Sequence, residues 1–124
     1  MIPYILTEEE FSKLPKEKQT CCVEFYGGYR YWYKEGKIQR EDGPAIEWSS
    51  GDKYWYKEGK PHRLDGPAIE YPSGSKEWFK NGKFHREDGP ARELADGTKE
   101  YWFNNKRYSY TKWYAIVNGL EKFI

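Results

Sequence analysis

The hydrophobic positions of this chain are largely aromatic, and they come in short runs bounded by turn-forming residues. The aromatic run at 54–56 lies between the turn signals Ser50-Gly51 and Glu58-Gly59 and has a lysine on each side. Aromatic runs between short segments that end in Gly or Asn are typical of β-strands joined by tight hairpins, since such turns need positive backbone φ angles. The pattern therefore predicts antiparallel β-hairpins along most of the chain.

The whole pattern returns every 23 residues. The tetrapeptide Asp-Gly-Pro-Ala occurs at 42–45, 65–68 and 88–91. Three further columns of the repeat hold identical or similar residues: Glu24, Glu47, Glu70 and Glu93; Gly28, Gly51, Gly74 and Gly97; Trp32, Trp55, Trp78 and Tyr101. A fixed period of this size marks an array whose units bury their apolar side only against neighbouring units. We therefore expect one structural domain with a repeat array at 20–111, divided at about 20–42, 43–65, 66–88 and 89–111.

Each unit carries two turn signals and one signal for a bend. Two-residue turns are expected at Ser50-Gly51 and Glu58-Gly59, and at the equivalent pairs of the other units. Within the long strand expected at 60–72, the segment Asp65-Gly66-Pro67 interrupts the strand, because Pro lacks an N–H donor and Gly permits a sharp bend. We expect the half before the bend to pair with the preceding short strand, and the half after it with the following one. The predicted fold is mainly β: an elongated, twisted antiparallel β-meander.

The two ends differ from the repeat and are predicted to cap it. The cap at 1–19 contains a capping box that begins at Thr7, which predicts a short helix through Leu14. The cap at 112–124 fits either a helix that stops at Asn118-Gly119 or a last strand, and we favour the helix. Caps are expected because the end units of an array otherwise expose open edges.

Composition indicates which side chains must build the core. Only 37% of the 124 residues are hydrophobic and the mean hydropathy is −1.10, values that by themselves favour little burial. Aromatic residues make up 19% of the chain, however, and each ring buries roughly 150–250 Å². We therefore expect aromatic rings to form the core. The formal net charge is +1, so no overall field draws the protein to nucleic acid or to an anionic membrane.

The two cysteines and the N-terminal segment predict a cytoplasmic protein. Cys21 and Cys22 are adjacent, so a disulfide between them is unfavourable, and both are interpreted as small buried residues in a reducing compartment. The segment at 1–10 lacks the basic and apolar regions of a signal peptide. No stretch approaches the roughly 20 apolar residues needed to span a bilayer.

Two phrases of the sequence resemble the MORN repeat, which also has a 23-residue period built on hairpins. These phrases are Tyr-Pro-Ser-Gly-Ser-Lys at 71–76 and Lys-Asn-Gly-Lys-Phe-His at 80–85. The glycine spacing departs from the standard unit. The run Arg-Glu-Asp-Gly-Pro-Ala, at 40–45 and 86–91, is similar to a divergent MORN-like repeat of phage and giant-virus proteins. The resemblance implies a β-repeat fold that binds proteins or lipids and has no catalytic centre.

Successive strand residues point to opposite faces, so Trp55 and Tyr56 cannot share one core. With two-residue turns, Trp55 is expected between Ile46 and His62. Tyr56 is then expected beside Ala45, whose small side chain indicates close packing, so we interpret the tyrosine side as interior. The tryptophan side combines flat rings with histidine and lysine and is predicted to be the binding face.

The second half of the array carries a predicted acidic patch. Glu47, Tyr54 and Arg63 are expected side by side across three strands, and in later units Glu replaces this Tyr. Stacked like charges would then attract a basic partner surface. The alternative is a solvated face balanced by nearby Arg and Lys side chains. The patch comprises Glu70, Glu77, Glu93 and Glu100.

No residue pattern indicates a catalytic or metal centre. His62 and His85 stand in equivalent positions, but Gln39 and Tyr108 replace them in the flanking units, and no further ligand lies nearby. The repeated Asp of Asp-Gly-Pro is interpreted as a cap for backbone N–H groups at the bend rather than as a calcium ligand. We predict no cofactor and no enzymatic activity, since no Ser/His/Asp set, phosphate-binding loop or carboxylate pair is evident.

The sequence therefore predicts a non-enzymatic module that binds a protein partner through one aromatic and charged face. Its specific form, from the viral MORN-like resemblance, is an inhibitor of a host defence factor in the host cytoplasm. The alternatives are a nucleic-acid binder or mimic and a peripheral lipid-binding protein, and the oligomeric state is left open. The predicted partner-binding residues are Trp32, Trp55, Trp78, His62, His85, Glu70, Glu77, Glu93 and Glu100.

Overall fold

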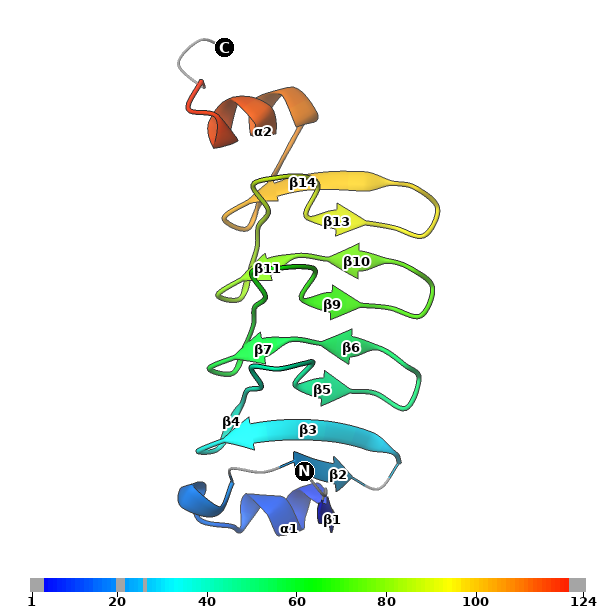
Figure 1. The fold of residues 1–124 in the computed structure, drawn as a ribbon, viewed down its shortest axis with the longest axis vertical. Coiled ribbons are helices and arrows are strands. Elements are labelled where there is room, and N and C mark those ends of the chain that lie inside the picture. The colour runs from blue at the N-terminus through cyan, green and yellow to red at the C-terminus, as the bar shows by residue number, and fades with distance from the viewer. Residues whose placement is uncertain (1–3, 20–21, 26, 121–124) are drawn as a thin grey trace.

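The chain folds into an elongated stack of β units that lies between two helical ends (Figure 1). The computed structural model describes residues 4–19, 22–25 and 27–120. The helices are α1 (Glu8–Ser12), the 3₁₀ turn η1 (Lys16–Lys18) and α2 (Tyr110–Val117). The strands are β1 (Tyr4–Leu6), β2 (Cys22–Phe25), β3 (Tyr29–Lys34), β4 (Lys37–Ile38), β5 (Ile46–Glu47), β6 (Lys53–Tyr54), β7 (Tyr56–Lys57), β8 (Lys60–Pro61), β9 (Ile69–Glu70), β10 (Lys76–Glu77), β11 (Phe79–Lys80), β12 (Lys83–Phe84), β13 (Arg92–Glu93), β14 (Lys99–Phe103) and β15 (Lys106–Tyr108).

One 11-stranded sheet runs the length of the stack, and two short hairpins lie beside it. Its strand order is β1-β2-β3-β5-β6-β9-β10-β13-β14-β15, with β4 paired to β3, and the hairpins are β7-β8 and β11-β12. Among the described residues, the strand pairs are antiparallel except for β1 with β2, which is parallel. The expected mainly-β fold, an elongated antiparallel β-meander, is therefore confirmed.

Each repeat strand pairs along two different parts of its length. In the second unit, residues 53–54 of β6 pair with both β5 and β9, whereas residues 56–57 of β7 pair with β8. β8 and β9 belong to one long segment, which bends between them at Asp-Gly-Pro. The predicted bend is confirmed, but the half after it pairs with the preceding short strand as well as with the following one.

The first turn of each unit is one residue longer than predicted. In the second unit, the N–H of Trp48 donates to the carbonyl of Asp52 (3.0 Å) and the N–H of Gly51 donates to the carbonyl of Trp48 (2.9 Å). The loop is therefore the three residues 49–51, and it ends in Gly51 with a positive φ of 99°, as such loops do. The prediction of a two-residue turn was wrong here. The extra residue shifts the register between the two strands by one. Because side chains alternate, each residue of one strand then shares a face with a different set of residues of the other strand than expected.

The shifted register gives the strand residues different neighbours from those expected. Tyr54 lies opposite Ile46 on one side and Ile69 on the other. Trp55 donates its N–H to the carbonyl of Ala68 (2.7 Å), which continues the same register. The prediction that placed isoleucine beside the tryptophan and alanine beside the tyrosine was therefore wrong, and alanine lies on the tryptophan side of the sheet.

The second turn of each unit has two residues, as predicted. Glu58 and Gly59 have φ angles of 53° and 75°, and the strands that they join pair Tyr56 with Pro61. In the last unit Asn105 stands in the glycine column and keeps a positive φ of 68°. Asn tolerates this conformation better than most residues with a side chain, so the turn is preserved without glycine.

α1 covers the N-terminal end of the array. Its N-cap is Thr7, whose side chain accepts the N–H of the residue three positions later (3.0 Å), as the capping-box spacing predicted. The helix ends at Ser12, two residues earlier than predicted. Its buried Phe11 places its ring centroid 6.1 Å from that of Phe25 and 4.2 Å from that of Tyr33, which closes the first unit of the stack.

α2 packs over Tyr101 of β14 at the opposite end, and the prediction of a helix rather than a last strand is confirmed. Its N-cap is Ser109, which accepts the N–H of the residue three positions later (3.2 Å), and Gly119 lies beyond its C-terminus with a φ of 69°. Trp113 and Ala115 are the buried residues of the helix. Together they attach α2 to the last unit.

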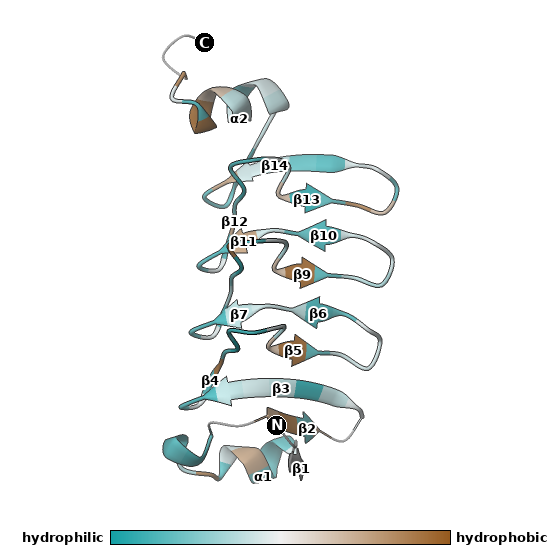
Figure 2. Ribbon diagram, in the orientation of Figure 1, coloured by the Kyte–Doolittle hydropathy of each residue, from teal (hydrophilic) through white to brown (hydrophobic). Residues whose placement is uncertain are grey.

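The array is a thin structure without a large central core. Its accessible surface is 7964 Å², compared with about 7,000 Å² for a compact protein of 14.9 kDa. Figure 2 shows hydrophobic residues concentrated in β2, β5, β9 and parts of the helices. The alanines of the repeat, Ala45, Ala68 and Ala91, are fully buried and Phe25 of β2 is buried, whereas the repeated tryptophans and tyrosines of the strands are only partly buried. The tyrosine side, expected as interior, therefore also meets solvent.

Candidate interaction face

The two faces of the sheet present different side chains. We call the face that carries Trp32, Trp55 and Trp78 the tryptophan face; the residues two positions away along each strand share it. We call the other the tyrosine face, because Tyr31 and Tyr54 lie on it together with the isoleucines opposite them. The predicted binding residues divide between these two faces.

On the tryptophan face, an arginine lies over each tryptophan ring. The guanidinium carbon is 4.1 Å from the ring centroid for Arg40 over Trp32, 4.0 Å for Arg63 over Trp55 and 3.9 Å for Arg86 over Trp78. Such a cation–π contact contributes about 0.5–2 kcal/mol, depending on its exposure. These pairs were not predicted from the sequence, although an arginine two residues before every Asp-Gly-Pro was a visible signal.

Each of these guanidinium groups is also bound by its own Asp-Gly-Pro segment. In the second unit, Nε of Arg63 donates to Asp65 (3.1 Å), and Nη1 donates to the carbonyl of Pro67 (3.1 Å) and to Glu70 (3.3 Å). The first and third units repeat the contacts to Asp and Pro. The Asp was predicted to cap backbone N–H groups at the bend, but it binds the arginine instead.

The guanidinium of each arginine lies where a side chain on the glycine of Asp-Gly-Pro would lie. A Cβ atom on Gly66 would lie 2.9 Å from Cζ of Arg63, and the same distance is 2.9 Å at Gly43 and 2.8 Å at Gly89. None of these three glycines has a positive φ. Glycine was expected to permit a sharp bend here. The bend does not use the left-handed backbone that favours glycine, and the guanidinium occupies the space of the missing side chain.

The last unit replaces the arginine with part of α2. Ser109 occupies the arginine column and serves as the N-cap of the helix. Trp113 places its ring centroid 4.9 Å from that of Tyr101, the last residue of the tryptophan column, and its Nε1 donates to the carbonyl of Arg86 (2.9 Å). A helix side chain therefore covers the ring that an arginine covers in the other units.

Grooves open between successive Asp-Gly-Pro segments on the tryptophan face. The first has a volume of about 710 Å³ and includes Trp55 and His62 in its lining, and the second has about 600 Å³ and includes Trp78 and His85. The three Asp-Gly-Pro segments that border the grooves, at 42–44, 65–67 and 88–90, form ridges together with the residue before each, and we call these ridges the crests. Leu64, on the middle crest, is 78% exposed. The exposed residues of the three crests are Glu41, Asp42, Leu64, Asp65, Glu87 and Asp88.

His62 and His85 connect neighbouring units. Nδ1 of His62 accepts the N–H of Asn81 (2.9 Å) in the second turn of the next unit, and His85 makes the equivalent bond at 3.0 Å. Gln39 does the same with its side-chain oxygen (3.2 Å). Burial, followed by the charges of nearby lysines, lowers the pKa of His62 and so favours the neutral form that can accept this bond. Among the described residues, no three His, Cys, Asp or Glu side chains converge as a metal site.

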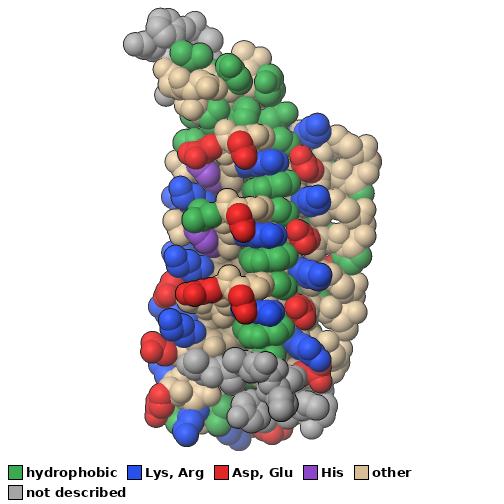
Figure 3. Space-filling model, viewed as in Figure 1, with side chains coloured by type: hydrophobic (Ala, Val, Ile, Leu, Met, Phe, Trp, Pro, Cys, Tyr) green, Lys and Arg blue, Asp and Glu red, His purple; other side chains and the backbone are tan. Residues whose placement is uncertain are grey.

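Acidic and basic residues alternate across the strands of the tryptophan face. Glu70 lies opposite Lys53 and Lys76, and Glu93 lies opposite Lys76 and Lys99. The alternation continues in the first units through Glu47, Arg30 and Glu24. Figure 3 shows the regular rows of basic and acidic side chains on this face. The predicted stack of like charges is wrong, because the longer first turn places a basic residue opposite each of these glutamates.

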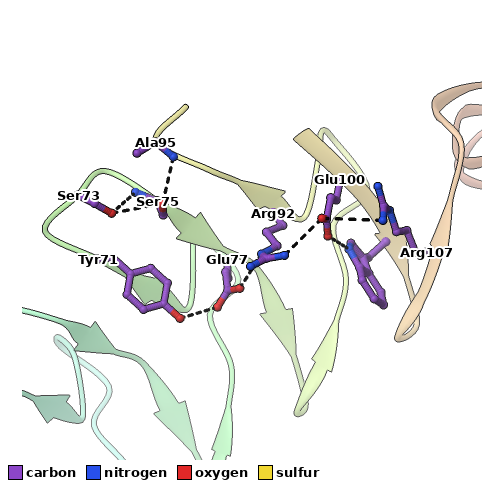
Figure 4. Close-up of polar contacts among 9 residues, drawn as sticks. Tyr71, Ser73, Ser75, Glu77, Arg92, Ala95, Glu100 and Arg107 are labelled. Carbon is purple, nitrogen blue, oxygen red and sulfur yellow. Dashed lines mark hydrogen bonds and ion pairs between the residues drawn. The ribbon is translucent and has the colours of Figure 1, made fainter. Parts of the chain in front are cut away.

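Glu77 and Glu100 lie on the tyrosine face, in a network around Arg92 (Figure 4). Nε of Arg92 is 3.1 Å from a carboxylate oxygen of Glu77, and its Nη1 is 3.3 Å from one of Glu100. Tyr71 donates its hydroxyl to Glu77 (2.8 Å), and Trp102 donates its indole N–H to Glu100 (3.1 Å). The two glutamate side chains are only 12% and 11% exposed, so they do not contribute to an acidic surface patch.

The environment of Tyr71 shows how strongly this network differs from a solvated surface. Burial first, and then the hydrogen bond to the Glu77 carboxylate, raise the pKa of Tyr71 well above its usual range. In the first two units the same positions hold Tyr31, Ile46, Tyr54 and Ile69. The tyrosine face therefore changes along the array from aromatic and aliphatic to ionic.

No known protein family, curated protein or solved structure matches this chain. In the part of the chain that the structure describes, no helix has the length and apolar character needed to cross a membrane. The resemblance to MORN-like repeats therefore stays a prediction. A function must be inferred from the faces of the array themselves.

Proposed function

We propose that this protein is a non-enzymatic module that binds a protein partner on the tryptophan face. The observation that carries the proposal is the row of crests and grooves, in which carboxylates flank an exposed leucine. The grooves are lined by the partly exposed Trp55 and Trp78, and aromatic residues are enriched at protein interaction sites.

The tryptophan face is ordered before a partner arrives. Stacking on Trp55, together with bonds to Asp65 and to the carbonyl of Pro67, holds Arg63 in one arrangement, and the other units repeat it. Binding to such a surface loses little side-chain entropy, which leaves more of the interaction energy for affinity. Two strands at about 4.8 Å each give a rise of roughly 10 Å per unit, so the three crests span a distance suited to a protein interface.

The crests indicate the chemistry of the partner. The Asp42, Asp65 and Asp88 side chains are 88%, 89% and 88% exposed, and Leu64 projects from the middle crest. An apolar side chain with carboxylates around it fits a partner surface that has an apolar socket bordered by Lys or Arg. Acidic and basic residues alternate on this face and form no continuous basic stripe, so a protein partner is favoured over nucleic acid and over lipid headgroups.

The predicted binding residues enter this proposal in different ways. Trp55 and Trp78 line the two grooves together with His62 and His85, and Trp32 holds the arginine behind the first crest. Glu70 and Glu93 lie beside the stacks, where they bind Arg63 and Arg86 and lie opposite lysines of the neighbouring strands. The buried Glu77 and Glu100 are left out of the proposed surface.

The specific form that we propose is a viral inhibitor of a host defence factor, acting in the host cytoplasm. The MORN-like resemblance supports a viral origin, and the adjacent cysteines support a reducing compartment. An inhibitor of this kind needs an ordered binding surface and no catalytic group.

The test compares two variants that each add one arginine at an exposed position. Leu64→Arg changes the middle crest, whereas Ser50→Arg changes a loop at the far end of the same unit. Both should fold, since substitutions at exposed sites usually change the free energy of unfolding by less than about 0.5 kcal/mol. The partner is isolated from a cell extract with the wild type, and its affinity for all three proteins is then measured.

We expect Leu64→Arg to weaken binding at least about tenfold and Ser50→Arg to leave it unchanged. Equal affinity of the two variants for the partner would show that the crests are not the binding surface. Binding of single-stranded oligonucleotides that weakens steeply with salt, or sedimentation with liposomes, would favour one of the alternative functions instead.

A further inference from the structure

The last unit of the array has an open strand edge. Lys99 and Glu100 of β14 pair with β13, whereas β15 pairs only with the later residues of β14, from Tyr101 onward. In the preceding units, the equivalent residues of β3, β6 and β10 pair with strands on both sides. The segment at 115–116, which would form the next strand by the repeat, lies in α2 (Figure 1). Among the described residues, the outer edge of 99–100 therefore has no strand partner.

The tryptophan face shows what this edge lacks. Lys76 lies opposite Glu70 on one side and Glu93 on the other, and the basic residues of β3 and β6 are flanked in the same way. Lys99 is exposed and lies opposite Glu93 alone. Opposite charges in directly facing positions stabilise a strand pair. The empty position beside Lys99 therefore favours a carboxylate.

The repeat also indicates which residue precedes that carboxylate. In β5 and β9 the glutamate that faces the basic residues follows an isoleucine, and in β13 it follows Arg92. These preceding residues point to the tyrosine face, where Glu100 lies. Nη1 of Arg107 already lies 4.0 Å from a carboxylate oxygen of Glu100, so a further arginine is not needed on this face. An extended segment with Ile-Glu therefore matches both faces of the open edge.

We propose that this edge is a docking site for an extended strand of a partner protein, which joins the sheet antiparallel to β14 and places a carboxylate against Lys99. Backbone N–H and C=O groups supply affinity in this mode of recognition, and alternating side chains supply specificity. The site is formed by the end of the sheet and not by the crests, so this inference does not rest on the proposed function.

A second copy of this chain fits the edge poorly. In a symmetric antiparallel pair, the residue next to the two-fold axis lies directly opposite its own copy, because opposite residues must share a face. At this edge that residue is Lys99 or Glu100. The first arrangement opposes two lysines and the second opposes two glutamates, and both are destabilising. Lysine on an edge strand also discourages self-association. The expected occupant is therefore a strand of a different sequence.

A probe for this site comes from the chain itself. The peptide Gly-Pro-Ala-Ile-Glu-Tyr-Pro, residues 66–72, contains the Ile-Glu of β9 in its natural surroundings. A fluorescent form of this peptide is titrated into the full chain, and binding is followed by anisotropy. A second peptide with Lys in place of Glu serves as the charge-reversed probe.

We expect saturable binding of the first peptide and about tenfold weaker binding of the second. Lys99→Glu should reverse this preference, because its carboxylate would then face the lysine of the second peptide. Lys57→Glu is the matched control: it changes an exposed lysine on β7, away from the edge, and should keep the wild-type preference. Bound peptide should also slow hydrogen exchange of the backbone amides of β14.

The proposal is overturned if neither peptide binds, if both bind equally well, or if Lys99→Glu leaves the preference unchanged. A dimer of the wild type that competes with the peptide would show that a second copy occupies the edge, which also overturns it. Leu64→Arg should bind the peptide as the wild type does. Failure at the edge is therefore distinguishable from failure at the crests.

Discussion

The tryptophan face and the tyrosine face of this array are built from the same strands, yet the first keeps its residues along the chain and the second changes them. The tryptophan face keeps Trp, Arg, Asp, Gly and Pro in the same columns of three successive units. The tyrosine face begins with tyrosine and isoleucine and ends with Glu77, Arg92 and Glu100.

The position of the contacts relative to the bend explains this difference. On the tryptophan face, Arg63 binds Trp55, Asp65 and Pro67 around the bend itself, so every bend needs the whole set. On the tyrosine face the contacts lie between strands and away from the bend, as between Glu77 and Arg92. A set of neighbouring residues there can be exchanged together without changing the bend of any single unit.

The largest expected effect comes from breaking the network on the tyrosine face. Arg92→Ala removes the cation between two nearly buried carboxylates and should lower the free energy of unfolding by roughly 2–3 kcal/mol, less than for a fully buried pair because Arg92 is partly exposed. Denaturant unfolding measures this change. The companion variant Glu77→Tyr, Arg92→Ile, Glu100→Tyr introduces the residues of the first units and should recover most of the loss.

A triple variant as unstable as Arg92→Ala would show that the ionic network does more than replace the tyrosine and isoleucine of the first units. The ionic network would then be required in the last units. The ionic residues and the tyrosine and isoleucine residues would not be interchangeable sets on the tyrosine face.

A smaller effect is expected on the tryptophan face from one added methyl group. Gly66→Ala places a Cβ atom 2.9 Å from Cζ of Arg63 and should lower the free energy of unfolding by about 1–2 kcal/mol. In an Arg63→Ala background the same change should cost less than about 0.5 kcal/mol, because the clash is gone. A double-mutant cycle from denaturant unfolding measures the coupling. An equal cost in both backgrounds would mean that the backbone of the bend, and not the arginine, requires glycine.

The smallest effect is a pH dependence at the border between units. The folded protein lowers the pKa of His62, so the stability from its neutral form is complete above the unfolded pKa of about 6.5 and is lost as pH falls from there to the folded pKa. His62→Gln keeps an acceptor, as Gln39 does one unit earlier, and removes this titration. The difference in unfolding free energy between wild type and variant should therefore depend on pH between 8 and 5. A constant difference would contradict the role of the neutral ring.

Features that depend on one short segment were predictable from the sequence. The turn at Glu58-Gly59 was read from residues that accept positive φ, and the capping box at Thr7 was read from spacing alone. The helix at the C-terminus also followed from local signals around Asn118-Gly119. Each of these depends on backbone conformations that few residue types adopt.

The candidate site was predicted only in part. Ser50-Gly51 fits a two-residue turn as well as the three-residue loop that forms, and the wrong choice exchanged the faces of Ala68 and of Glu70. The pairing of Arg63 with Trp55 was missed, because the bend brings together residues that an extended strand would keep apart. The tryptophans themselves were identified as a column of one face, and the structure adds the arginines that hold them.

By itself, then, the sequence determined the 23-residue period, the antiparallel hairpins and the helical caps, since these follow from local backbone preferences and from spacing. Only the tertiary structure decided which side chains share a face and which charges are paired. A strand that shifts by one residue keeps all its local preferences but exchanges its two faces. The register is therefore set by packing across strands, in which the alanines fit beneath the tryptophan face and each guanidinium fits against its glycine.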